Sequence, residues 1–183
     1  SEKLEADVFG SIFHRVIARL YQPFINQTIH SEMLESILRD EDTIKSHISE
    51  AFAYLSFKLP AGSIIELRGN DLLIAEVIFK YIKGVLKSDK KHTPFTYISG
   101  EEEYKSRLQT RYGNVNLKGY IDRVDAKDGA VRIIDYKTGF AKDISVKTEE
   151  IEVVYQKEDK AKQLQLIFYA HLFYGDAKYQ NQP

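Results

Sequence analysis

Two aspartates and a lysine stand among β-branched residues in the stretch GYIDRVDAKDGAVRIIDYKTG, residues 119–139. They are Asp122, Asp135 and Lys137. Charged side chains are uncommon in apolar strands, because burying a charge without a partner is unfavourable. Their presence therefore indicates either a binding site or a solvated edge of a sheet.

The spacing of the stretch places these residues on one face. Asp128-Gly129 separates two apolar runs and predicts a tight hairpin loop. Counting outward from this loop sets Asp122 opposite Asp135, with Cβ atoms roughly 4.5–5.5 Å apart. Lys137 shares the face of Asp135, because side chains alternate along a strand.

This arrangement favours metal chemistry. Two carboxylates at such a distance repel each other, and a divalent cation would remove the repulsion. Mg²⁺ and Mn²⁺ suit paired carboxylate oxygens and accept water and phosphate oxygens as further ligands. The neighbouring Lys137 can orient or deprotonate a water molecule. For one residue alone we favour a solvated strand position, but three on one face predict metal-dependent phosphodiester hydrolysis.

Other charged residues near the hairpin are interpreted separately. Asp125 and Arg132 oppose each other on the other face and are expected to form an ordinary cross-strand ion pair. Glu101, Glu102 and Glu103 end the preceding strand, and one of them is a candidate for a further metal ligand. Alternation puts Glu101 and Glu103 on one face, and the sequence leaves the choice open.

A histidine near the start of the chain has space around it. Gly10, His14 and Ala18 are spaced i, i+4 and i+8, so they share one face of a predicted helix. Small neighbours leave room for an imidazole to meet a metal ion. Taken alone, His14 is better interpreted as a helix-surface residue.

Near the end of the chain, Gln165 and Tyr169 are spaced i and i+4 on a predicted helix. They form either the polar edge of an amphipathic helix or a pair that faces the site. In the second case they would bond the metal-bound water, the phosphate or the lysine region.

The elements that must position these residues follow from periodicity. Helices are expected over residues 3–22, 30–40, 42–57, 71–87 and 158–175. Strands are expected over 95–102, 104–112, 116–125 and 130–137, and a weaker pattern favours one at 151–155. Asp42 or Thr43, and Asn70 or Asp71, are the expected helix caps. The order predicts an α/β or α+β architecture with one sheet between helices. No linker divides it, so residues 1–183 are expected to form a single domain.

Composition narrows the class of protein. The chain has 183 residues, 43% hydrophobic and 29% charged, as expected for a globular domain with its own core. It contains no cysteine, which excludes disulfides and thiolate-held metals within this segment. No membrane span or signal peptide is predicted, and a cytoplasmic location is expected. The net charge of −1 means that DNA contact would depend on local patches or a partner, and residues 87–92 are one small basic cluster.

Four motifs together resemble a known family. GSIFH (10–14), GYIDRVD (119–125), IIDYKTG (133–139) and QLIFY (165–169) occur in the order seen in RecB-type nucleases of the PD-(D/E)XK superfamily. The superfamily motif is named for a proline before its first aspartate, whereas this chain has Ile121 directly before Asp122. The resemblance implies a restriction-endonuclease-like core, in which helices flank a mixed central sheet and an N-terminal helical region is added.

The resemblance also implies roles for individual residues. His14, Asp122 and Asp135 match metal ligands, and the main-chain carbonyl of Tyr136 matches a further ligand. Lys137 matches the catalytic lysine. The implied cofactor is Mg²⁺, for which Mn²⁺ can substitute.

Gln165 and Tyr169 match the family's downstream catalytic motif. The implied activity is a DNA nuclease, an exonuclease by expectation, supplied with DNA by a helicase domain or subunit during recombinational repair of double-strand breaks. On this interpretation the chain is a piece of a larger AddB-like or RecB-like helicase–nuclease.

Two alternatives stay open at this point. One is a catalytically weak or inactive module that binds DNA or acts as a scaffold within a helicase–nuclease complex. The presence of both aspartates together with Lys137 argues against it. The other is a metal-dependent phosphoesterase for small substrates, which would need a closed pocket.

Overall fold

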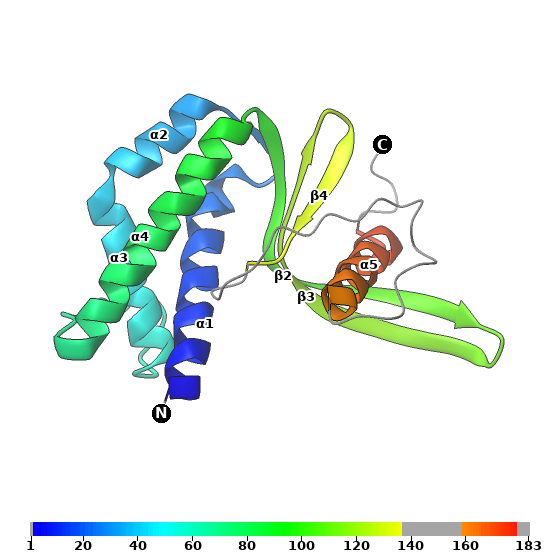
Figure 1. Ribbon diagram of the computed structural model, residues 1–183, viewed down its shortest axis with the longest axis horizontal. Coiled ribbons are helices and arrows are strands. Elements are labelled where there is room, and N and C mark those ends of the chain that lie inside the picture. The colour runs from blue at the N-terminus through cyan, green and yellow to red at the C-terminus, as the bar shows by residue number, and fades with distance from the viewer. Residues whose placement is uncertain (1, 137–158, 179–183) are drawn as a thin grey trace.

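A computed structural model of the chain describes residues 2–136 and 159–178 (Figure 1). Four helices come first and one closes the described chain. They are α1 (Glu2–Tyr21), α2 (Ser31–Arg39), α3 (Glu41–Leu55), α4 (Gly69–His92) and α5 (Asp159–Gly175), with a short 3-10 turn η1 (Gln22–Phe24) after α1. None of the described helices is both long and apolar enough to pass through a membrane.

One four-stranded antiparallel sheet lies between the helices. Its strands are β1 (Gln27–Ile29), β2 (Phe95–Thr110), β3 (Gly113–Lys127) and β4 (Ala130–Ile134), and they neighbour each other in that order. Helices α1–α4 gather on one side, and α5 packs on the long β2–β3 hairpin on the other (Figure 1). The α+β prediction is confirmed, and the arrangement is consistent with a restriction-endonuclease-like fold. The strand expected at 151–155 lies outside the described residues.

Apolar side chains form two clusters, one for each helical layer. The larger joins α1–α4 to the first residues of β2, with Ile12, Val16 and Phe95 among its buried members. The smaller lies between the hairpin and α5, where Val124 and Leu172 are fully buried. The sheet is therefore held from both sides.

Several boundaries differ from those expected. β1 was not predicted, and its three residues pair with the start of β2. Helix α3 begins earlier, because the side chain of Asp40 caps it by accepting a hydrogen bond from the Thr43 amide at 3.1 Å. Helix α4 begins after Arg68 rather than at an Asn70 or Asp71 cap, and it runs on to residue 92. β2 is one strand where the pattern suggested two.

The hairpin register is as predicted. The pairs between β3 and β4 run from Lys127↔Ala130 to Arg123↔Ile134, with Asp128 and Gly129 in the loop. Both loop residues have positive φ, 52° and 78°, as a tight hairpin turn requires. The ladder ends at Ile134, one residue before Asp135.

Gly119 in β3 allows α5 to approach the sheet closely. A Cβ atom at this position would lie 2.8 Å from Leu172 Cδ1 and 3.3 Å from Phe168 Cε1. Both contacts are shorter than normal carbon–carbon packing distances. The glycine therefore sets the depth at which α5, which carries Gln165, sits on the hairpin.

We expect Gly119→Ala to lower the free energy of unfolding by about 1–3 kcal/mol, because the added methyl overpacks the interface with α5. Urea denaturation measures the change. Gly84→Ala is the matched control, since Gly84 is exposed in α4 with nothing within 4 Å of its added methyl. That variant should gain about 0.5–1 kcal/mol from helix propensity. Equal stabilities for Gly119→Ala and wild type would contradict the close packing.

Candidate active site

His14 reaches from α1 to the end of the hairpin. Its Nε2 lies 3.1 Å from the main-chain oxygen of Tyr136, and its Nδ1 lies 3.4 Å from Asp122 Oδ1. The side chain keeps 21% of its surface exposed. Three of the predicted metal-binding groups thus lie close together, although His14 precedes the other two by more than 100 residues in the chain.

The end of the hairpin is held by a second contact to Asp122. The amide of Tyr136 donates a hydrogen bond to Asp122 Oδ2 at 2.7 Å. One carboxylate oxygen therefore orients the segment after β4, while the other faces His14. This contact continues the hairpin beyond the last ladder pair and keeps Asp135 beside the site.

Asp135 is in contact with the closing helix. Gln165 donates from Nε2 to Asp135 Oδ1 at 3.3 Å and to the Tyr169 hydroxyl at 2.6 Å. Of the two interpretations of this pair, the structure supports the one in which Gln165 faces the site. The predicted contact partner was the metal-bound water, the phosphate or the lysine region, whereas the observed partner is the carboxylate itself.

Lys137 lies outside the described residues, as does Gly139 of the same motif. Its catalytic role stays a prediction from the sequence. The last described residue before it, Tyr136, is fixed through both its amide and its carbonyl.

Glu101 is the member of the acidic run that faces the site. Its Oε1 lies 3.7 Å from His14 Nδ1. Glu102 instead pairs with Lys178 at 2.6 Å, and Glu103 pairs with Lys105 at 2.9 Å. Alternation along the strand had predicted that Glu101 and Glu103 share one face of the sheet.

The backbone explains why alternation could not identify Glu101. Its φ is 48°, in the left-handed region that side-chain-bearing residues rarely adopt. The β2–β3 ladder pairs Gly100 with Arg123 and Glu102 with Ile121, which sets Glu101 across from Asp122. Strained conformations of this kind cluster at functional sites.

Electrostatics at Glu101 favour a cation. Burial raises the pKa of this carboxyl, the charge of Asp122 raises it further, and His14 lowers it. Two carboxylates and one imidazole are therefore gathered where negative charge is unfavourable in the absence of a positive ion.

The donor atoms fit Mg²⁺ or Mn²⁺. Carboxylate and carbonyl oxygens are the donors that these ions prefer, and Asp122 and the Tyr136 carbonyl supply them at the two ring nitrogens of His14. Within the described ranges, no three His, Asp or Glu side chains form a ready-made metal site. The Tyr136 carbonyl would add an oxygen to the donors that the side chains supply.

Comparison with known proteins identifies the family. The family model of the PD-(D/E)XK nuclease superfamily matches residues 1–183. No curated protein and no solved structure matches the chain.

We expect Glu101→Gln to raise the melting temperature in EDTA at pH 7–8. A raised pKa means that the folded chain binds the proton more tightly than the unfolded chain, so ionised Glu101 destabilises the fold above its folded pKa. The difference should vanish as the pH falls below the ordinary pKa of 4.5. Thermal melts from pH 4 to 8 measure it.

Glu103→Gln is the matched control for that measurement. Ion pairing with Lys105 lowers the pKa of Glu103, so removing its charge should give no gain at neutral pH. A melting temperature for Glu101→Gln that stays below that of wild type at pH 8 would contradict the unfavourable charge at Glu101.

Proposed function

The chain belongs to the PD-(D/E)XK nuclease superfamily, and from that premise we propose that it is a metal-dependent nuclease that hydrolyses phosphodiester bonds in DNA. The observation that carries the proposal is the approach of His14 to both Asp122 and the Tyr136 carbonyl. These groups have the chemistry of a hard-cation site. They are among the groups that the sequence predicts as metal ligands.

The roles of the residues follow from their contacts. His14, Asp122, Asp135 and the Tyr136 carbonyl would hold Mg²⁺, with Mn²⁺ as a substitute. When bound, such an ion lowers the pKa of a water molecule and stabilises charge on the scissile phosphate and the leaving oxygen. We assign Lys137, on the resemblance, to positioning the attacking water.

Gln165 would act on the site through Asp135. Its amide donates to Asp135 Oδ1 at 3.3 Å, which would orient this carboxylate toward the ion. Tyr169 accepts from the same amide and restricts its rotation. Such outer contacts fix the direction of a ligand and raise metal affinity.

The finer identity rests on motif order. We propose a RecB-like nuclease domain, spanning residues 1–183 of a larger helicase–nuclease, with an exonuclease role in recombinational repair of double-strand breaks. The rival is an inactive module that binds DNA or acts as a scaffold. The gathering of Asp122, Glu101 and the Tyr136 carbonyl around the His14 ring supports the active form, because a scaffold has no need for a strained Glu101 beside Asp122.

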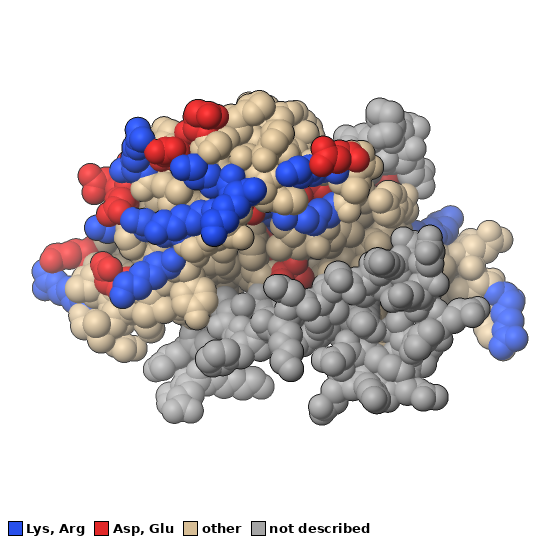
Figure 2. Space-filling model, turned by 45° about the horizontal axis from the view of Figure 1, so that its top comes forward, with Lys and Arg blue, Asp and Glu red and all other residues tan. Residues whose placement is uncertain are grey.

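A cationic groove between α2 and α4 is a candidate path for the DNA backbone. Its volume is about 650 Å³. It is lined by Ser31, Glu35, Leu38, Arg39, Lys83, Lys87, Lys90 and Lys91. Lysine and arginine side chains gather on this helical side of the molecule (Figure 2). The chain as a whole carries a charge of only −1, so such a local concentration matters for binding a polyanion.

Part of this positive charge is already neutralised. Glu35 pairs with Lys90 at 2.8 Å and with Arg39 at 2.6 Å, and Glu41 pairs with Lys83. Among the described residues, Lys87 and Lys91 have no ion-pair partner. They lie one helical turn apart, roughly 6 Å along the axis, and are the cations best placed to contact phosphates.

We expect wild type to degrade linear DNA in Mg²⁺ or Mn²⁺, tested on single- and double-stranded substrates. His14→Ala, Asp122→Ala, Asp135→Ala and Lys137→Ala should each lower the rate at least about 100-fold, because each removes a ligand or the group that orients water. Gln165→Ala should lower it by about 10–100-fold, as expected for an outer contact.

Two controls complete the experiment on degradation. Glu102→Gln removes an acidic neighbour that is paired with Lys178 away from the site, and it should retain wild-type activity. Calorimetric titration with Mn²⁺ identifies a scaffold, since a folded wild type that neither cuts DNA nor binds Mn²⁺ through Asp135 would contradict the nuclease proposal.

For the groove, we expect the double variant Lys87→Gln, Lys91→Gln to bind duplex DNA more weakly in EDTA. The slope of log K against log salt concentration should become less steep by about 1.8, because each phosphate contact contributes about 0.9. Fluorescence anisotropy at several salt concentrations measures the slope. Lys58→Gln, Arg68→Gln removes the same charge outside the groove and should leave it unchanged. A wild-type slope for the groove variant would show that DNA does not follow this groove.

A further inference from the structure

The side chain of Tyr136 is anchored apart from its main-chain contacts. Arg123 donates from Nη1 to the Tyr136 hydroxyl at 3.0 Å. The ring of Tyr136 meets that of Phe13 edge to face, with centroids 5.5 Å apart. Burial raises the pKa of this hydroxyl to about 12, so it stays protonated at any pH relevant to function.

Arg123 is the largest of the fully buried side chains, with 1% of its surface exposed. Its Nη1 lies 2.5 Å from Asp89 Oδ2, on α4, and its Nη2 lies 2.7 Å from Asp125 Oδ2, on its own strand. The rings of Tyr21 and Phe95 cover the guanidinium, with centroids 4.7 and 4.9 Å away. A charge desolvated to this degree is stable only in one paired geometry.

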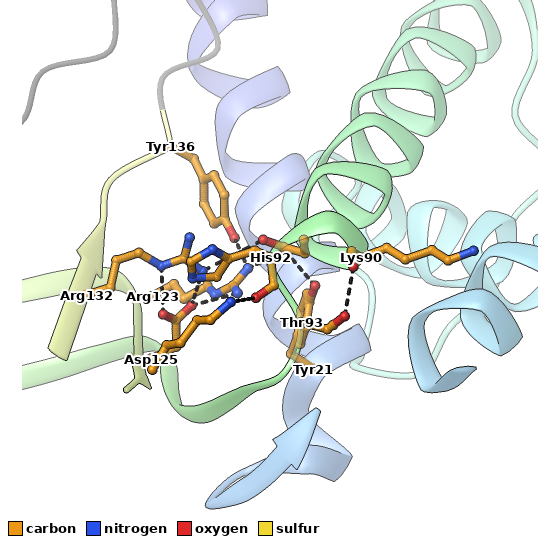
Figure 3. A network of polar contacts seen from close by, with 10 residues as sticks. Tyr21, Lys90, His92, Thr93, Arg123, Asp125, Arg132 and Tyr136 are labelled. Atoms are coloured by element: carbon orange, nitrogen blue, oxygen red, sulfur yellow. Dashed lines mark hydrogen bonds and ion pairs between the residues drawn. The ribbon is translucent and has the colours of Figure 1, made fainter. Parts of the chain in front are cut away.

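The carboxylates around Arg123 are themselves fixed (Figure 3). The hydroxyl of Tyr21, on α1, donates to Asp89 Oδ2 at 2.6 Å. Arg132 binds both oxygens of Asp125 at 2.8 Å, which confirms the predicted cross-strand pair. Asp125 is fully buried whereas Arg132 keeps 36% of its side chain exposed, so this pair connects the polar network around Arg123 to the surface.

Tyr136 is the residue where this network meets the candidate site. Its hydroxyl is bound by Arg123, its amide by Asp122, and its carbonyl by His14. These three contacts hold the ring of Tyr136 and the main-chain groups on both sides of its Cα. The direction of the carbonyl is therefore tied to the position of a buried charge.

We propose that Tyr136 is a positioning residue, whose hydroxyl, held by Arg123 and the Asp89–Tyr21 pair, fixes its carbonyl as a metal ligand. The inference rests on the proposed function and adds to it the side chain that makes the carbonyl effective. Without the hydroxyl contact the ring could shift, and only the bonds to Asp122 and His14 would hold the main chain of Tyr136. The ion would then meet a ligand of variable direction.

Tyr136→Phe tests this inference, because it removes only the hydroxyl and keeps the ring against Phe13. We expect the affinity for Mn²⁺, measured by calorimetric titration without DNA, to fall by about 10–100-fold, as for other outer contacts of metal ligands. Circular dichroism should show an unchanged fold. The fall in affinity should appear also as a higher Mn²⁺ requirement for cleavage.

Tyr104→Phe is the matched control. It removes a buried tyrosine hydroxyl that bonds Ser99 in the cluster beside α5, so it should lose stability without losing affinity for Mn²⁺. Tyr21→Phe provides a second test that spares residue 136 itself. It deletes the bond to Asp89, and we expect a smaller fall in Mn²⁺ affinity in the same direction.

The outcomes separate the inference from the proposed function. Wild-type Mn²⁺ affinity in Tyr136→Phe would overturn the positioning role and leave the nuclease proposal intact. Equal falls in affinity for Tyr136→Phe and Tyr104→Phe would show a general effect of stability and overturn it too. Absence of Mn²⁺ binding by the wild type would overturn the proposed function, and with it this inference.

Discussion

The buried guanidinium of Arg123 is the interaction on which the rest of the structure depends. It ties the sheet to both helices behind it, through Asp89 on α4 and through the Tyr21 hydroxyl on α1. Removing one partner from a buried ion pair costs about 3–5 kcal/mol, so these elements cannot shift independently. Hydrophobic contacts alone would permit sliding, whereas a desolvated charge admits one arrangement.

This constraint lies one residue from the candidate chemistry. Arg123 directly follows Asp122 in β3, so the strand that carries the predicted ligand is fixed by its neighbour. Arg123 also binds the Tyr136 hydroxyl, so it restrains the segment that follows β4 as well. His14 lies on the helix that also carries Tyr21, which joins the third ligand to the network. His14 on α1 and Asp122 on β3 thus lie on regular elements, as precise metal sites require, and Asp135 and Tyr136 directly follow β4, where Asp122 binds the Tyr136 amide.

The sequence predicts features that local chemistry decides and misses those that depend on tertiary contacts. Asp128-Gly129 determines its own turn, and the turn determines the register, so the pairing of the hairpin was predictable. Arg123 lies between Asp122 and Asp125 in the motif, a pattern that is typical of a solvated strand. Its burial depends on Asp89, which is 34 residues away in another element. The positive φ at Glu101 likewise reverses the alternation on which its assignment depended.

The same contrast separates the two charged clusters of this protein. Around Arg123, positive and negative groups are paired, and the pairing fixes one arrangement of the elements that carry them. Around His14, Glu101 and Asp122 place negative charge together, and burial, with the charge of Asp122, raises the pKa of Glu101. A sequence in which local preference, packing and electrostatics all favour the same fold would avoid such a cluster of negative charge. Exceptions of this kind are expected at functional sites. The rigid network holds these carboxylates close together, and the cation of the proposed nuclease would relieve their repulsion, which would couple its binding to fold stability.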